Sequence, residues 1–172
     1  MPIPLPIVTE RIVIRAFDPV ADAAPMLRVY GDAEVMRFVP GGALADEAAV
    51  RALLETYARA QAERGFSSWA VVERASEQVI GDVGFGIFAA SGEVELGYTL
   101  ARAHWGRGLA TEAAHAALAA GLAHLEVPRI VAVVDAENAA SVRVAERLGM
   151  TRSADVHAHG RPHVLFAVDR VR

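Results

Sequence analysis

A glycine-containing turn is the part of this sequence best suited to bind a ligand. It reads WGRGLATEA and joins a predicted strand to a long apolar helix. Gly106 and Gly108 let the backbone turn tightly and approach a ligand without a Cβ in the way. The helix that follows brings unpaired N–H groups and the positive end of its dipole to the same point. Phosphates commonly bind at such helix starts, so the turn indicates a phosphate-bearing cofactor.

The two common nucleotide-binding loops do not fit this turn. A Walker loop needs a lysine after its last glycine, and the chain contains no lysine. The dinucleotide fingerprint needs three glycines spaced G-x-G-x-x-G, and the third position is Thr111 here. Taken alone, the turn is equally compatible with a plain strand–turn–helix connection.

A second helix start lies one strand further along, in the segment NAASVRVAERLGM that begins at Asn138. Asn138 is a favoured N-cap residue. Ser141 lies in the first turn and faces the same end of the helix. The buried stripe of this helix is expected to consist of Val142, Ala145 and Leu148.

The composition narrows the class of protein. With 172 residues, 53% of them hydrophobic, the chain is long enough for one globular domain, which we expect over residues 1–172. A net charge of −4 without a clustered basic stripe argues against nucleic-acid binding. The absence of cysteine excludes a disulfide framework, a thiolate nucleophile and a cysteine-ligated zinc. The absence of lysine excludes a lysine Schiff base.

The sequence carries no pattern of a targeting or membrane segment. Its first residues, MPIPLPIVTERIVIR, lack the charged n-region and the long apolar h-region of a signal peptide. No uninterrupted apolar stretch is long enough to span a bilayer. We therefore expect a cytoplasmic protein that has no membrane partner.

Hydrophobic periodicity predicts a mixed α/β fold. Strands are predicted over residues 11–17, 67–73, 79–88, 93–101, 129–134, 150–156 and 164–170. Helices are predicted over residues 19–38 with a break near 31–32, and over 47–64, 109–125 and 139–148. Asp18 and Asp46 are the expected N-caps of the first two helices, and Gly65 is expected to end the second. This order favours an antiparallel meander followed by one β-α-β crossover.

Four segments, in sequence order, resemble one superfamily of enzymes. They are TERIVIRAF with DAEVMRFV, the strand ELGYTL, the turn WGRGLATEA, and N-x-x-S-x-R ending in GM. Together they resemble the GNAT superfamily of acetyl-CoA-dependent N-acetyltransferases, in the branch of the ribosomal-protein alanine N-acetyltransferases RimJ and RimL. The resemblance covers essentially the whole chain. It implies a twisted, mostly antiparallel sheet of about seven strands, flanked by helices and splayed between its fourth and fifth strands, here ELGYTL and RIVAVV.

The resemblance also implies how acetyl-CoA is bound. Main-chain groups would pair with the pantetheine arm, polarise the thioester carbonyl and hold the pyrophosphate. Those for the pantetheine arm belong to Tyr98, Thr99 and Leu100, and those for the pyrophosphate to Gly106, Arg107, Gly108, Leu109, Ala110 and Thr111. The Asn138 side chain would contact the pantetheine or acetyl end. The guanidinium of Arg107 could contact a phosphate or be a solvated surface charge. Trp105 replaces the usual Gln or Arg, which leaves main-chain contacts unaffected.

Acetyl transfer to an amine needs a base for the amine, stabilisation of an oxyanion, and a thiolate that is protonated or tolerated. Glu95 lies in an E-x-G-Y pattern that members of the branch often carry, and it is the expected base, acting through a water. Its pKa would rise if the cleft desolvates it. Glu95 could instead orient the acceptor or pair with an arginine. Asp82 and Glu93 are the other candidates for the base.

At the position of the usual proton donor to the sulfur, this sequence departs from the superfamily pattern. Many members carry a tyrosine seven residues after the asparagine, where this chain has Ala145. Ser141 is the alternative that the resemblance offers, as a hydrogen-bond donor near the thiolate, although it could equally cap the helix. Tyr98 lies on the cofactor strand, but its ring is expected to pack in the core.

The resemblance frames the acceptor site by residues 32–42 and by the last two strands. Met36, Phe38 and Val39 could form its apolar wall, or each could simply pack in the core.

Three histidines near the C-terminus invite a metal interpretation. His157, His159 and His163 are spaced H-x-H-x3-H, but no acidic or cysteine partner adjoins them and the implied fold needs no metal. We therefore expect them, together with Arg161, to flank the acceptor side of the cleft.

Three functions remain open on the sequence. The leading one is an acetyltransferase acting on a protein N-terminus or on a small-molecule amine. An enzyme with another phosphate ligand would instead bind ATP or NAD. A non-catalytic CoA-binding module is the third, since a cofactor cradle can persist without chemistry. Monomer and homodimer are both compatible with the sequence.

Overall fold

The structure, a computed structural model, describes residues 1–170, and within that range it contains one eight-stranded sheet in the order β1-β2-β3-β4-β5-β6-β8-β7. The strands are β1 (Ile7–Val8), β2 (Ile12–Arg15), β3 (Ser68–Glu73), β4 (Val79–Phe88), β5 (Glu93–Leu100), β6 (Arg129–Asp135), β7 (Thr151–Ala158) and β8 (Arg161–Asp169). The helices are α1 (Ala23–Tyr30), α2 (Glu47–Arg64), α3 (Leu109–His124) and α4 (Ala139–Arg147), with short 3-10 helices η1 (Val35–Phe38) and η2 (Arg102–His104).

Capping residues set the ends of α2 and α4 as predicted. The side chain of Asp46 accepts a hydrogen bond from the N–H of Ala49 at 2.8 Å, and α2 ends at Gly65, which has a positive φ of 78°. The side chain of Asn138 accepts from the N–H of Ser141 at 3.2 Å at the start of α4.

Two elements at the N-terminal end differ from the prediction. Helix α1 begins at Ala23 and not at Pro19. Asp18 caps a turn and not the helix, because its carboxylate accepts hydrogen bonds from the N–H groups of Val20 and Ala21. The two-residue strand β1 pairs with β2 and was not predicted, so the described sheet has eight strands where about seven were expected.

The sheet opens between β5 and β6. Strands β1 to β5 form an antiparallel meander, and β6, β8 and β7 form a second antiparallel group. These two groups meet as parallel strands, and within residues 1–170 their register consists of the single pair Glu95 and Val131. This is the splay that the family resemblance implied between ELGYTL and RIVAVV.

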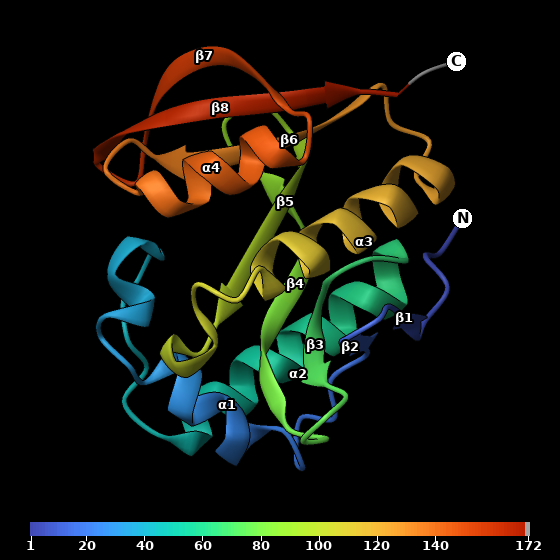
Figure 1. The fold of residues 1–172 in the computed structure, drawn as a ribbon, viewed down its shortest axis with the longest axis vertical. Coiled ribbons are helices and arrows are strands. Elements are labelled where there is room, and N and C mark those ends of the chain that lie inside the picture. Colours follow the sequence, from blue (N-terminus) through green and yellow to red (C-terminus); the bar gives the residue numbers. More distant parts are fainter. Residues whose placement is uncertain (171–172) are drawn as a thin grey trace.

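Helices cover both faces of the sheet. In Figure 1, α3 lies across β4 and β5, with α4 beside β6. Leu109 and Ala113 of α3 belong to the larger core cluster, together with Phe85 of β4. Helices α1 and α2 form a second core on the opposite face, where Met26 and Leu54 are fully buried. None of the helices within residues 1–170 is long and apolar enough to cross a membrane.

Candidate active site

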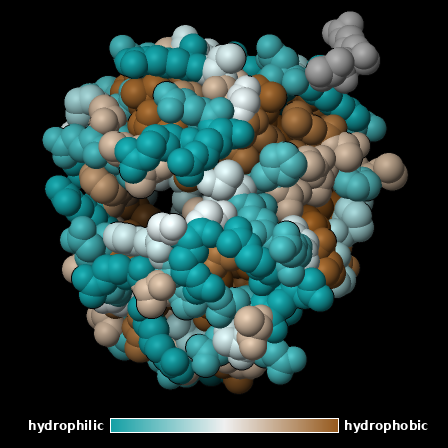
Figure 2. Space-filling model, viewed as in Figure 1, coloured by the Kyte–Doolittle hydropathy of each residue, from teal (hydrophilic) through white to brown (hydrophobic). Residues whose placement is uncertain are grey.

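A cleft opens where β5 and β6 separate. Its volume is about 730 Å³, and its walls come from η1, β5, the glycine turn, the end of β6 and α4. Figure 2 shows a hollow on this face of the molecule, between the region of η1 and that of α4, with hydrophobic residues inside. Of the residues expected to carry catalysis or to bind the cofactor, all except Arg107 line this cleft: Glu95, Tyr98, Thr99, Leu100, Gly106, Gly108, Leu109, Ala110, Thr111, Asn138 and Ser141.

One edge of β5 presents main-chain groups to the cleft. β5 pairs with β4 along its whole length, but with β6 near its start only. The N–H of Ala101 donates to the carbonyl of Ile80 at 2.8 Å, which fixes the side that faces β4. Since main-chain groups point alternately to the two sides of a strand, those of Thr99 face β4, and those of Tyr98 and Leu100 face the cleft. Thr99 can therefore reach the cleft through its side chain only.

The glycine turn is open toward the cleft. Gly106 and Gly108 have positive φ values of 71° and 76°, a region that side-chain-bearing residues rarely adopt. A Cβ at Gly106 would meet no atom within 4 Å. Gly108 is the N-cap of α3 and offers no side-chain cap, so the N–H groups in the first turn of α3 remain available to a ligand. Trp105 braces the turn against β5, since its indole N–H donates to the carbonyl of Leu100 at 2.8 Å.

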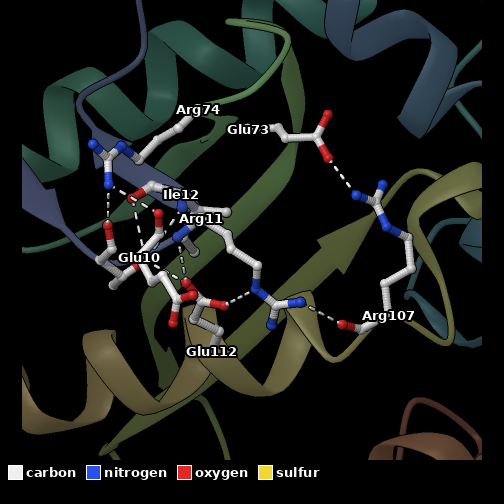
Figure 3. A network of polar contacts seen from close by, with 8 residues as sticks. Glu10, Arg11, Ile12, Glu73, Arg74, Arg107 and Glu112 are labelled. Carbon is white, nitrogen blue, oxygen red and sulfur yellow. Dashed lines mark hydrogen bonds and ion pairs between the residues drawn. The ribbon is translucent and has the colours of Figure 1, made fainter.

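The Arg107 side chain is engaged by a carboxylate. Its Nη2 donates to Oε1 of Glu73 at 2.7 Å, as Figure 3 shows, and Arg107 does not line the cleft. Ser76 donates to the other oxygen of Glu73 at 2.7 Å. Hydrogen bonds from Ser76 and Arg107 lower the pKa of Glu73, which keeps it an anion. In this structure the guanidinium of Arg107 forms this ion pair while half of its side chain stays exposed, so its contact with a phosphate stays a prediction.

Ser141 and Tyr98 meet across the cleft floor. The Tyr98 hydroxyl donates to Oγ of Ser141 at 2.9 Å, which joins β5 to the first turn of α4. The ring of Tyr98 packs against the larger core cluster, as predicted. Asn138 caps α4 through the main-chain N–H of Ser141, so the Ser141 hydroxyl is not used for capping. Ala145, at the position of the superfamily's tyrosine, is buried.

Glu95 lies on the cleft wall and is partly buried. Desolvation by burial raises the pKa of its carboxyl above the ordinary range, although the N–H of Val133 and the nearby His163 partly oppose the shift. A raised pKa makes a carboxylate a stronger base, and the cleft gives it access to a ligand.

The two other candidate carboxylates do not line the cleft in the part of the chain that the structure describes. Asp82 is buried on β4, and desolvation raises its pKa to about 6. Glu93 pairs with Arg129 at 2.5 Å, and this partner lowers the pKa of Glu93. Of the three, Glu95 is the one that the geometry offers to a substrate.

An aromatic ring between two arginines borders the end of the cleft near η1. The guanidinium carbons of Arg37 and Arg161 lie 5.1 Å and 5.7 Å from the ring centroid of Phe38. Phe38 and Val39 line the cleft, as considered for the apolar wall. Met36 is buried in the core formed with α1 and α2, which is the alternative considered for it. Contacts between η1 and β8 therefore bridge this end of the cleft.

The three histidines do not gather around one point. His163 is buried and its Nδ1 donates to the carbonyl of Arg161 at 2.9 Å. The ring of His159 packs edge-on against that of His163 at 5.9 Å, and His157 is exposed. Across residues 1–170, no group of three or more His, Asp or Glu side chains is arranged to hold a metal ion.

Two features of the site went unrecognised in the sequence. The first is the hydroxyl pair of Tyr98 and Ser141, which lie 43 positions apart in the chain. The second is the bridge from Phe38 to Arg161, for which the adjacent Arg37 and the following loop gave only a weak signal. Both depend on contacts between distant segments.

The splayed sheet, with a glycine turn at a helix start beside its open strand, has the geometry of a site for an extended, phosphate-bearing ligand. Residues 11–151 match the family model described as the acetyltransferase (GNAT) domain, so the chain belongs to that family. The chain is 30% identical to the Bacillus subtilis (strain 168) protein YkkB, described as uncharacterized, over 93% of each sequence. Its fold is shared by a GNAT-family acetyltransferase from Bacillus anthracis, with a TM-score of 0.83, 24% identity, and coverage of 96% of this chain and 99% of that one. A ribosomal-protein-S5-alanine acetyltransferase from Vibrio fischeri also shares the fold, with a TM-score of 0.81, 17% identity and 97% coverage of both chains.

Proposed function

We propose that this protein transfers an acetyl group from acetyl-CoA directly to a primary amine, as a RimJ/RimL-like N-acetyltransferase of the cytoplasm. Membership of the GNAT family supports the reaction type, because the family generally uses acetyl-CoA. The observation that carries the proposal is the cleft, which joins an unpaired strand edge, an open glycine turn and one desolvated carboxylate.

The residues present fit acetyl-CoA. The main-chain groups of Tyr98 and the N–H of Leu100 suit the amide-bearing pantetheine arm, which would extend the sheet as an added strand, while the Leu100 carbonyl already accepts from Trp105. The N–H groups that follow Gly106 suit the pyrophosphate. Asn138 has one amide oxygen engaged in capping and keeps its NH₂ group for the pantetheine end. Bound in this way, acetyl-CoA supplies an activated acyl group as a thioester.

In the proposed reaction, a bond forms between the amine nitrogen and the acetyl carbon, and the bond from that carbon to sulfur breaks. Glu95 takes the proton that the amine loses, through a water. Ser141 can donate a hydrogen bond to the leaving sulfur, because its oxygen already accepts the Tyr98 proton and its own proton is free to point elsewhere. The two hydroxyls would thus replace the tyrosine for which this chain has Ala145.

The acceptor would enter at the end of the cleft bordered by Phe38. There Glu95 lies on the face of β5 that is turned toward the core formed with α1 and η1, as its register with β4 indicates. The Vibrio fischeri structure is described as an acetyltransferase for an alanine of a ribosomal protein. By analogy, we propose a protein N-terminus as the first acceptor to test and small-molecule amines as the second.

Titration calorimetry with acetyl-CoA, with ATP and NAD as controls, tests the cofactor. We expect selective binding of acetyl-CoA. Gly106→Ala should weaken it, whereas Gly149→Ala is the matched control. Both glycines have a φ above 70°, and a Cβ at either would meet no atom within 4 Å, so both changes cost similar backbone strain, but Gly149 lies outside the cleft.

Release of CoA thiol is then measured with peptides that have a free N-terminal alanine or serine, and with polyamines, amino sugars and amino acids. Thiol release that depends on the amine supports the proposal. Tight acetyl-CoA binding without thiol release for any amine would favour a non-catalytic CoA-binding module. Preference for ATP or NAD would overturn the assignment of the cofactor.

A further inference from the structure

The back of the glycine turn is held by Arg11, which directly precedes β2. Its Nη1 donates to the main-chain carbonyl of Arg107 at 2.8 Å, and its Nε donates to Oε2 of Glu112 at 2.6 Å. Figure 3 shows this guanidinium reaching from the residue before β2 to both partners. Arg11 lies close to Gly108 as well, since Nη2 would be 3.6 Å from a Cβ built there.

Glu112 is an anion in the first turn of α3. Burial would raise the pKa of its carboxyl, but hydrogen bonds from the Thr9 hydroxyl, at 2.6 Å, and from Arg11 outweigh burial and lower it. A negative charge at this position interacts favourably with the positive end of the helix dipole, but it would repel a second anion bound at the same helix end. The guanidinium of Arg11 neutralises that charge.

The hydrogen bond to the Arg107 carbonyl fixes the orientation of one peptide group. In a trans peptide, the C=O of one residue and the N–H of the next point in opposite directions. Because the carbonyl of Arg107 is held toward Arg11 behind the turn, the N–H of Gly108 must point away from Arg11. Gly108 lines the cleft and Arg107 does not, so this N–H is turned toward the open side.

We propose that Arg11 is a positioning residue for the phosphate end of the cofactor, which aims the Gly108 N–H at the pyrophosphate and cancels the charge of Glu112. The Arg107 side chain cannot fill this role while it is paired with Glu73. Anion recognition at the turn therefore rests on the main chain and on one arginine that never touches the ligand. This inference depends on the proposed function, because the pyrophosphate is that of acetyl-CoA.

A ligand pair separates this role from general stabilisation. CoA carries the pyrophosphate on its pantetheine arm, and S-acetyl-pantetheine has the same arm, with its thiol acetylated, and no phosphate. Arg11→Met should weaken CoA binding about tenfold, the effect of losing one charge-assisted hydrogen bond from the Gly108 N–H to the pyrophosphate. It should change the affinity for S-acetyl-pantetheine less than about twofold. Calorimetry measures the first ligand and ligand-detected NMR the second.

Arg74→Met is the matched control. Arg74 belongs to the same network, but its guanidinium donates to the carbonyl oxygens of Thr9 and Glu10, at 3.0 Å and 2.9 Å, and not to the turn. It should leave the affinity for both ligands within about twofold of wild type, since a contact that only braces the chain adds nothing specific to the phosphate. Thermal unfolding of each variant shows how much stability was lost.

Arg11→Lys provides a second variant in case Arg11→Met does not fold. A lysine keeps the charge but cannot serve both acceptors with one rigid fork, so CoA should again be weakened selectively. Equal weakening of both ligands, or unchanged CoA binding in folded variants of Arg11, would overturn the positioning role. Wild-type protein that binds neither ligand would instead overturn the proposed function.

Discussion

Asp82→Asn should make the protein more stable at neutral pH. Asp82 is buried on β4, and its Oδ1 has no hydrogen-bond partner among the described residues. Desolvation raises the pKa of its carboxyl to about 6 from an ordinary value of 3.8, although the hydroxyls of Tyr30, Thr99 and Ser68 limit the rise. A neutral side chain of the same shape avoids the cost of burying this charge.

The sign follows from proton binding in the two states. With the higher pKa in the folded state, the native protein binds the proton of Asp82 more tightly than the unfolded chain does. The free energy of unfolding of wild type therefore falls as the pH rises from about 4 to about 6, and stays low above that. A shift of about two pKa units corresponds to roughly 3 kcal/mol, of which about 2 kcal/mol falls between pH 4.5 and 7.5.

Urea denaturation of wild type and Asp82→Asn at several pH values from 4.5 to 7.5 measures this effect. The difference between the two free energies of unfolding should grow in favour of Asp82→Asn by about 2 kcal/mol across that range. Asp155→Asn is the control, because it removes an exposed carboxylate of β7 and should follow the wild-type pH dependence. If the free energies of unfolding of wild type and Asp82→Asn changed in parallel with pH, the argument that ionisation of buried Asp82 destabilises the folded state would be refuted.

Three further changes test the site and the core. Glu95→Gln should lower kcat by about 10²-fold or more without weakening acetyl-CoA binding, and should remove the loss of rate at acidic pH that the raised pKa of Glu95 predicts; an unchanged rate would exclude it as the base. Ser141→Ala should lower kcat about tenfold with little change in the affinity for acetyl-CoA, as measured in steady state, and a change in affinity alone would leave Ser141 as a binding residue. Gly121→Ala should lower the free energy of unfolding, measured by urea denaturation, by about 1–2 kcal/mol despite the better helix propensity of alanine, because its Cβ would lie 2.5 Å from Phe85 and 2.9 Å from Ile130. Adding Phe85→Leu should recover part of the loss. A Gly121→Ala protein more stable than wild type would show that this core is loosely packed.

The elements that the sequence predicted well are those fixed by local interactions. The cap at Asp46 and the left-handed end at Gly65 need only a few neighbouring residues, and the structure confirms both. At Asp18 the same local signal misled, because its side chain caps a turn. A carboxylate near free N–H groups does not by itself show whether a helix continues.

The parts of the site that sequence did not predict depend on partners far along the chain. Arg107 could be placed in the turn, but its pairing with Glu73 spans 34 positions. The contact between Arg11 and Glu112 spans 101 positions. Spacing along one element cannot indicate such contacts, whereas the splay itself followed from a resemblance that covers the whole sheet.

Strand β5 would separate the two proposed substrates because its side chains alternate between the two faces of the sheet. Thr99 lies opposite Asp82, and Glu95 lies four residues before it on the same face, toward the core that includes η1. Tyr98 and Leu100 pack on the other face, toward α3, and their main-chain groups face the splay. A shift of one residue in the register of β4 and β5 would therefore move the proposed base to the wrong face and bury its charge in the larger core. The long antiparallel pairing of β5 with β4 is thus a condition for the chemistry, since it holds the proposed base and the proposed cofactor edge on one strand.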